Sequence, residues 1–206
     1  MSALPFLGIS VLTTILTPTG RSALRWVDPR PPQKAPVPAA TPWKRQLELA
    51  AKRHGLRPSL LAALVQVESG GRVDAMRHEP AFEDTYIRGN PRWSAARAAG
   101  WSDRDLATSW GLTQVMGATA WSLGFHGPPQ GMLIPARQLE LGAKYLRQRI
   151  DRWRLKDLAY QGVRLGLVAY NGGDGAARTV ANGVPHRSLY YAKNVLATEK
   201  RLKGAK

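Results

Sequence analysis

Five stretches of the chain carry apolar residues spaced three and four positions apart, which is the spacing of one face of an α-helix. They are residues 41–55, 58–71, 135–153, 158–173 and 188–202. No stretch shows a convincing alternation of apolar and polar residues, so the pattern predicts no sheet. The sequence therefore predicts a mainly α-helical protein.

The second of these helices ends in a carboxylate. Leu61, Leu64, Val65 and Glu68 fall on one face of it. A proline begins the stretch and two glycines follow it, as is typical of helix ends. Glu68 either turns toward water at the end of the helix or is held in a partly apolar cleft. The residues of this stretch alone leave both alternatives open.

Other helix boundaries are also marked in the sequence. Thr41 is a candidate N-cap before a proline, and Gly55 is typical of the end of that helix. The fourth stretch is expected to stop at Gly172 and Gly173. Between residues 72 and 110 the apolar periodicity is poor, and proline and glycine interrupt it. We therefore expect a loop-rich insertion there.

The chain divides into three parts by composition. Residues 1–27 are apolar up to Arg21 but are too interrupted for a bilayer span, and we interpret them as a docking or anchoring segment, with a disordered tail as the alternative. Residues 28–42 are rich in proline, as in a semi-rigid linker. The folded domain is expected to cover residues 43–206.

Composition excludes several kinds of site. The chain has no cysteine, so it forms neither disulfides nor thiolate metal sites. Its histidines are scattered, without a metal-binding spacing, at His54, His78, His126 and His186. We therefore expect neither a bound metal nor a cofactor.

The net charge of +16 is unevenly distributed. Residues 137–206 hold fifteen basic and five acidic side chains, so most of the excess lies in the last third. A surface of this kind favours polyanions, which include nucleic acid, an anionic membrane and an acidic cell-wall polymer. The charge narrows the class of partner without choosing among these three.

Three short stretches place polar side chains where helices start or stop. They are "VESGG" (67–71), "SWGLTQVMGATA" (109–120) and "VAYNGGDGAA" (168–177). Taken singly, each has a structural explanation, with Gln114 as a loop amide, Tyr170 as a core aromatic residue and Asn171 as a helix C-cap. The three stretches carry more information as an ordered set.

In this order, and followed by a tyrosine-bearing terminal helix, the stretches resemble the signature of lytic transglycosylases of the soluble lytic transglycosylase and goose-type lysozyme group. The resemblance covers roughly residues 43–202. It implies a lysozyme-like α-helical domain. The stretches "RHEPAFEDTY" and "GLTQVMGATAWSLGFHGPP" are most similar to the versions found in bacteriophages and prophages.

The resemblance implies cleavage of the β-1,4 bond between N-acetylmuramic acid and N-acetylglucosamine in peptidoglycan. Glu68 matches the sole catalytic carboxylate of the family, which protonates the leaving oxygen and then removes a proton from the C6 hydroxyl of the sugar. The product is a 1,6-anhydro sugar. An apolar cleft suits this role, because burial disfavours the charged form of a carboxyl group and raises its pKa.

The resemblance also implies substrate-binding residues. These match Ser69, Gln114, Met116, Tyr170, Asn171 and Tyr191. Gln114 is expected to hydrogen-bond an acetamido group of the sugar, and Tyr170 to place its hydroxyl near Glu68. Tyr190 competes with Tyr191 for the role of the terminal-helix tyrosine.

The sequence departs from the family pattern at two motif positions. Thr113 stands where methionine is common, and we expect it to add a hydroxyl group to the cleft floor. Gly117 stands where proline is common, and we expect it to loosen the start of a helix.

Residues 72–108 form an insertion that contains Glu79, Glu83 and Asp84. A second carboxylate reaching the cleft would permit hydrolysis, as in a lysozyme. Solvation, or pairing with Arg77 or Arg88, is the alternative for these acids.

Three functions and two locations follow as hypotheses. The first function is lytic cleavage of peptidoglycan, the second is hydrolysis by the same site, and the third is a catalytically idle structural or nucleic-acid-binding virion protein. We expect peptidoglycan glycan strands and other virion or tail proteins as partners, the latter through the N-terminal segment, and no specific nucleic acid. A phage virion acting in the host periplasm or cell wall is the expected location, with a bacterial periplasmic or secreted protein as the alternative.

Overall fold

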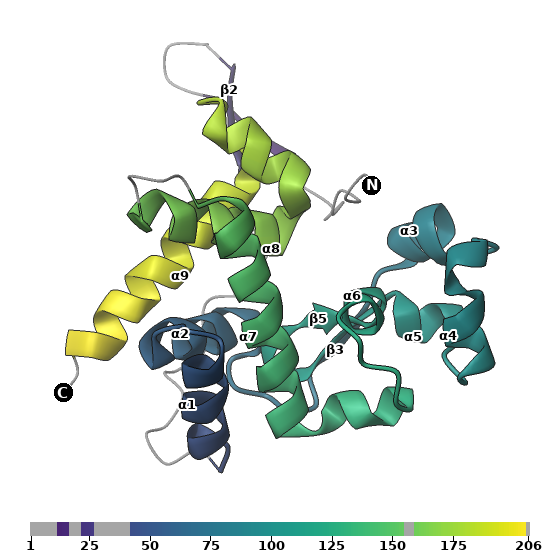
Figure 1. The fold of residues 1–206 in the computed structure, drawn as a ribbon. Helices are drawn as coiled ribbons and strands as arrows, with labels where there is room; N and C mark the ends of the chain where they lie inside the picture. Colours follow the sequence, from purple (N-terminus) through teal and green to yellow (C-terminus); the bar gives the residue numbers. More distant parts are fainter. Residues whose placement is uncertain (1–11, 17–21, 27–41, 155–158, 205–206) are drawn as a thin grey trace.

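The computed structural model describes residues 12–16, 22–26, 42–154 and 159–204 (Figure 1). Near the N-terminus, β1 (Leu12–Leu16) pairs antiparallel with β2 (Ser22–Trp26). The proposed linker lies outside the described residues apart from its last position, and the docking role of the N-terminal segment stays a prediction. No helix in the described part of the chain is long and apolar enough to cross a membrane.

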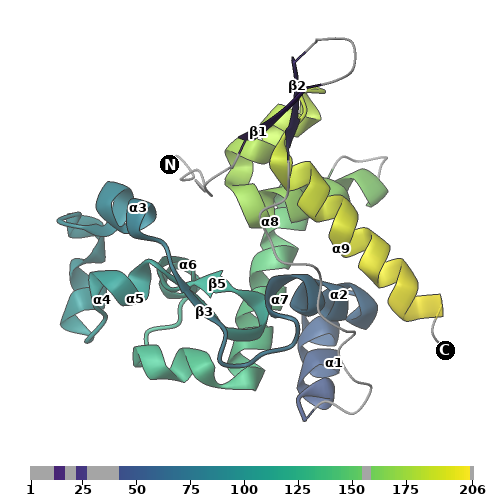
Figure 2. The ribbon, with the colours of Figure 1, turned by 180° about the vertical axis from the view of Figure 1, so that it is seen from behind.

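Five long helices form the bulk of the fold, and the prediction of a mainly α-helical protein is confirmed. They are α1 (Lys44–Arg53), α2 (Pro58–Ser69), α7 (Pro135–Arg152), α8 (Ala159–Ala181) and α9 (Arg187–Gly204). α7 packs against α1 and α8, while α9 packs against α2 and α8. Both views show these helices gathered at one end of the molecule (Figures 1 and 2).

Glycines end or break two helices, as their positions in the sequence predict. Gly70 terminates α2 in the left-handed conformation with φ 63°. Gly173 interrupts α8 with φ 75° and ψ 176°, so the predicted stop is correct, but a further helical segment continues directly to Ala181. At α1, the N-cap residue is Trp43 rather than Thr41, which lies outside the described residues.

A three-stranded antiparallel sheet lies between the long helices and the insertion, so the prediction of no sheet was wrong (Figure 2). Its strands are β3 (Met76–His78), β4 (Thr108–Trp110) and β5 (Val115–Met116). Strands of two or three residues are too short to show an alternating pattern, and pairing between distant segments stabilises them instead.

The insertion consists of short elements joined by turns. These are α3 (Pro80–Phe82), the π-helix η1 (Glu83–Ile87), the 3₁₀-helix η2 (Pro91–Trp93), α4 (Ser94–Ala98) and α5 (Asp103–Leu106). Arg97 ties them together, because its guanidinium donates to Ile87 O at 2.7 Å, Asn90 O at 3.1 Å and Asp103 Oδ1 at 2.7 Å. None of these helices is long enough to produce a clear apolar period.

The 3₁₀-helix η3 (Gly111–Thr113) joins β4 to β5, and α6 (Gly117–Ser122) and the 3₁₀-helix η4 (Pro129–Leu133) follow the sheet. α2 is buried on more than the predicted stripe, since Leu60 and Ala63 are also at most 1% exposed. The reason is that α1, α9 and η3 all pack against α2.

A polar clamp joins α9 to the start of α2. The carboxylate of Glu199 accepts hydrogen bonds from Arg57 at 2.7 and 2.9 Å and from Ser59 Oγ at 2.9 Å, and it pairs with Lys203 at 3.0 Å. Burial alone would raise the pKa of Glu199, but these donors outweigh it and lower the pKa to about 2. The clamp therefore fixes α9 in place along α2.

Candidate active site

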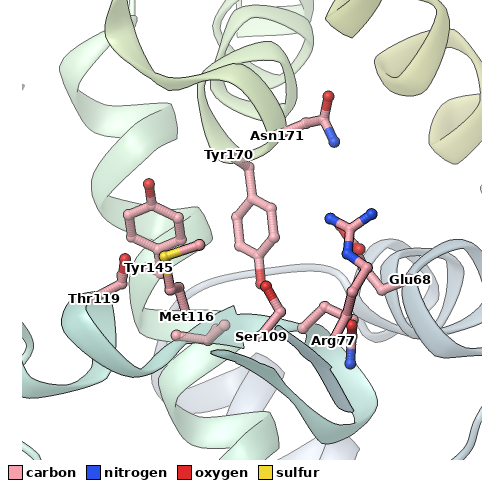
Figure 3. A pocket seen from close by; sticks show the side chains of 10 residues that line it. Glu68, Arg77, Ser109, Met116, Thr119, Tyr145, Tyr170 and Asn171 are labelled. Atoms are coloured by element: carbon pink, nitrogen blue, oxygen red, sulfur yellow. The ribbon is translucent and has the colours of Figure 1, made fainter. Parts of the chain in front are cut away.

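Glu68 lies in the last turn of α2, half-buried, beside a pocket of about 40 Å³. Figure 3 shows Glu68 and Arg77 on one side of this pocket, Tyr145 and Thr119 on the other, and Tyr170 between them. Of the two alternatives for Glu68, the structure therefore selects the carboxylate held in a cleft.

The register of the small sheet forms the floor of the pocket. Arg77 on β3 is paired with Ser109 on β4, and Ser109 is paired in turn with Met116 on β5. Residues that are paired across strands point to the same face of a sheet. All three line the pocket, as this register requires.

Gln114 also lines the pocket, but its amide nitrogen binds the protein backbone. Nε2 donates to Ala75 O at 3.0 Å and to Gly111 O at 2.9 Å. Gln114 has φ 49°, which is a sparsely populated conformation for a residue with a side chain, and these two bonds hold the turn in it. The turn therefore already uses the side-chain nitrogen of Gln114. This nitrogen is not placed to make the predicted hydrogen bond to an acetamido group of the sugar.

Buried Gln138 of α7 supports the loop that carries Gln114. Its Oε1 accepts from Leu112 N at 2.8 Å, and its Nε2 donates to Val73 O at 2.9 Å. The hydroxyl of Thr113 donates to Gln138 O at 2.8 Å and is fully buried. The expectation that Thr113 adds a hydroxyl group to the cleft floor was wrong, because that hydroxyl holds the loop onto α7.

Tyr170 and Asn171 enter the pocket from α8, just before the break at Gly173. The Tyr170 hydroxyl donates to Thr113 O at 2.8 Å, and its ring centroid lies 4.9 Å from that of Tyr145. Burial raises the pKa of Tyr170 well above its ordinary value, and the nearby charge of Glu68 adds to this effect. Tyr170 therefore lies near Glu68, but its hydrogen bond goes to the loop.

The hydroxyl group that contacts Glu68 comes from α9. Tyr191 Oη donates to Glu68 Oε1 at 2.5 Å. Tyr191 is 1% exposed, whereas its neighbour Tyr190 is 54% exposed. Of the two competing tyrosines, the structure therefore brings Tyr191 to the catalytic candidate.

Ser69 does not line the pocket, although the sequence predicts it as a substrate-binding residue. Its buried hydroxyl donates to Leu112 O at 2.9 Å and to Val65 O at 3.2 Å. The first bond joins the C-terminus of α2 to η3, and the second lies within α2. Ser69 is therefore placed to position its neighbour Glu68 rather than to contact a ligand.

Gly117 is tightly packed rather than a loosening element. A Cβ atom at this position would lie 2.2 Å from the carbonyl oxygen of Asp105 and 2.9 Å from the ring of Trp101. The insertion thus places its own backbone against the start of α6. A proline, which carries a Cβ atom, does not fit here, and this accounts for the departure from the family pattern.

Three acidic residues of the insertion, Glu79, Glu83 and Asp84, are paired with cations. Arg77 bridges to Glu79 at 2.6 Å, and Glu83 is bound by His78 at 2.6 Å and by Arg88 at 2.7 Å. Arg88 also reaches Asp84 at 2.9 Å. Burial raises the pKa of Glu79, although Arg77 opposes the shift. None of these three carboxylates is among the pocket-lining side chains of the described residues.

Comparison with protein families gives a match to the transglycosylase SLT domain over residues 46–191. This chain belongs to the transglycosylase SLT family. The matched SLT domain begins in α1, includes Glu68 and ends at Tyr191, the residue that donates to Glu68. Membership in this family supports peptidoglycan as the substrate. Within the described residues of the SLT domain, no group of three or more metal-ligating side chains is present.

Four residues of this SLT site have no clear signal in the sequence. Arg77 and Ser109 reach the pocket through strand register, which the sequence does not show. Tyr145 lies beside the apolar stripe of α7, and the sequence does not distinguish it from an ordinary half-buried aromatic residue. Gln138 offers the one weak signal, because a polar residue beside the buried Leu139 requires a hydrogen-bond partner.

Proposed function

We propose that this SLT-family chain is an active lytic transglycosylase, which cleaves the bond between N-acetylmuramic acid and N-acetylglucosamine in peptidoglycan. One observation carries the proposal. Among the described residues, Glu68 is the only carboxylate that lines the catalytic pocket. Glycoside hydrolysis ordinarily uses two carboxyl groups, one as the acid and one to activate water or attack the sugar. A single carboxyl group fits a reaction in which the substrate supplies its own nucleophile.

In the proposed reaction Glu68 acts first as an acid and then as a base. Its proton passes to the glycosidic oxygen, and the bond from C1 of N-acetylmuramic acid to that oxygen breaks. The C6 hydroxyl oxygen then bonds to C1, and its proton passes to Glu68. The carboxyl group is thereby regenerated, and no water is consumed.

Tyr191 is suited to orienting this carboxyl group. Its hydroxyl donates to Oε1, so that oxygen acts as the acceptor and the transferable proton belongs on Oε2. Burial disfavours the charged carboxylate, while the hydrogen bond from Tyr191 favours it. Opposing effects of this kind suit a group that must both release a proton and take one up.

Hydrolysis by the same site is the second candidate, and the ion pairs of Glu79, Glu83 and Asp84 argue against it. An idle virion protein is the third. Digestion of purified sacculi followed by mass spectrometry separates the three. We expect products with 1,6-anhydro ends, one water lighter than hydrolytic products. Reducing ends would assign hydrolysis, and no release from a folded protein would favour the idle alternative.

We also propose that the enzyme is a phage virion component that opens the wall locally during DNA entry. The similarity of its central motifs to phage and prophage versions supports this location, and the apolar N-terminal segment offers a means of docking to other virion proteins. Mass spectrometry of purified particles should detect the chain as a stoichiometric component. Recovery only from the periplasm or culture medium would favour a bacterial protein.

A further inference from the structure

A second and larger hollow, of about 340 Å³, adjoins the catalytic pocket. The two share Met116, Thr119 and Tyr145 as lining residues, so they adjoin along these three side chains, and the two together are called the groove. The volume falls within the usual range of ligand-binding clefts, whereas the pocket beside Glu68 is far smaller. A ligand that reaches Glu68 through this groove therefore contacts the larger hollow as well.

The two walls of the hollow come from different parts of the fold. Phe82, Arg92 and Trp93 belong to the insertion. Arg149 on α7 and Asp174, just after the break in α8, form the opposite wall. The insertion therefore adds a binding surface that the helices around Glu68 do not provide by themselves.

On the wall formed by α7 and α8, the carboxylate of Asp174 is shared by two arginines. Asp174 is 4% exposed, pairs with Arg149 at 3.2 Å and Arg152 at 2.9 Å, and accepts from Trp153 Nε1 at 2.9 Å. This carboxylate therefore already has its partners. It also partly neutralises Arg149, which stacks on Tyr145 with 5.1 Å between the guanidinium carbon and the ring centroid.

The insertion wall presents a cation of a different kind. Within residues 42–154 and 161–204, Arg92 forms no ion pair, and its guanidinium carbon lies 5.2 Å from the ring centroid of Trp93. Trp93 is itself fixed, because its Nε1 donates to Tyr86 O at 3.0 Å and its side chain is 3% exposed. Stacking on an immobile ring restrains the arginine while leaving its N–H groups available for an anion.

We propose that this hollow binds a carboxylate of the peptide attached to the glycan strand, and that Arg92 is the residue that recognises it. The inference rests on the proposed function, because it assigns a substrate preference to that same groove. Stem peptides carry free carboxylates, whereas an uncharged polymer of N-acetylglucosamine has none. The insertion thus makes the enzyme select strands that carry peptides over bare strands.

The test compares two substrates and two variants. Strands from sacculi are used either with their peptides or after removal of the peptides by an amidase, and the anhydro products are quantified to give kcat and KM. Arg92→Gln removes the proposed contact. Arg104→Gln is the matched control, because Arg104 is an exposed arginine of the same insertion that lines neither hollow.

Wild type should have the higher kcat/KM on peptide-bearing strands. In Arg92→Gln the ratio of kcat/KM between the two substrates should fall about threefold to tenfold, mainly through KM, as for a partly exposed charge contact. The effect should shrink with added salt, and Arg104→Gln should keep the wild-type ratio. An unchanged ratio in Arg92→Gln, or the same fall in both variants, would overturn the inference. Absence of anhydro products from wild type on both substrates would instead overturn the proposed function.

Discussion

Tyr191 on α9 donates a hydrogen bond to Glu68 on α2, across 123 positions of sequence. Replacing Tyr191 by Phe keeps the ring and removes the donor. Since a hydrogen bond to a charged group contributes about 1.5–3 kcal/mol, kcat should fall about tenfold to a hundredfold. Release of anhydro products from sacculi measures the effect. The exposed neighbour provides the control, because Tyr190→Phe should retain wild-type activity.

Glu68→Gln should abolish cleavage while leaving the fold intact. The amide keeps the size of the side chain but transfers no proton, and loss of general acid–base catalysis typically costs about a hundredfold to ten-thousandfold. Muropeptide release and thermal unfolding are measured together, with the exposed Glu48→Gln as the charge-matched control. A folded Glu68→Gln variant that digests sacculi at the wild-type rate would refute the assignment.

Gly117→Ala should destabilise the protein by about 1–3 kcal/mol, because the new Cβ atom meets a backbone carbonyl at 2.2 Å. Gly175→Ala serves as the control, since a Cβ atom there meets nothing within 4 Å. That control should be neutral or slightly stabilising. Chemical denaturation gives the free energy of unfolding of both variants. Equal values would contradict the prediction, because the backbone at Asp105 would then move aside at little cost.

Glu199→Gln should change how stability depends on pH. The folded-state pKa of about 2 lies below the ordinary value of 4.5, so the ionised carboxylate stabilises the fold fully above pH 4.5. This contribution is lost as the pH falls toward 2. The variant should therefore be less stable than wild type by about 1–3 kcal/mol at pH 7, and the difference should shrink in acid.

Urea unfolding at several pH values tests the Glu199 prediction. Asp84→Asn is the control, because Asp84 is an exposed carboxylate whose loss should leave the wild-type dependence on pH nearly unchanged. A difference between wild type and Glu199→Gln that stays constant from pH 7 to pH 3 would contradict the prediction.

The exposed lysines of α9 are expected to contribute to binding of the bacterial cell wall. Lys193 and Lys200 are exposed, whereas Lys203 belongs to the Glu199 clamp and is left in place. Lys193→Gln combined with Lys200→Gln should weaken binding to sacculi at low salt, and the loss should fade near 0.1 M salt, where the screening length is about 10 Å. Sedimentation with sacculi and DNA retention are measured in parallel. Loss of DNA retention alone would favour a nucleic-acid role for this charge.

The sequence predicts those parts of the site that helix ends specify. Glu68, Tyr170 and Asn171 stand beside glycines that stop or break helices, so their motifs can be found along the chain. Arg77 and Ser109 meet only through strand pairing, and Gln138 meets Leu112 and Val73 only through tertiary packing. These contacts join segments that are distant in sequence, so the local spacing of apolar residues does not predict them.

The insertion illustrates the same limit in the fold. Residues 72–110 lack a helical period because their longest helix has only five residues. Buried Ile87, Trp93, Trp101 and Leu106 stabilise the segment together with the bonds of Arg97, although no two of these apolar residues lie on one long helix. The frequent prolines and glycines therefore predicted the turns correctly. Tertiary contacts, which the sequence pattern does not show, determine the structure of the segments between the turns.

The distance in sequence between Glu68 and Tyr191 also sets an order of events during synthesis. At about 5–20 residues per second, a ribosome adds Tyr191 roughly 6 to 25 s after Glu68. During that interval the nascent chain carries the carboxyl group without the hydroxyl that fixes it. α9 follows every other described element, and the Glu199 clamp forms only when α9 docks. The proposed catalytic acid is therefore oriented only in chains whose synthesis has passed Tyr191.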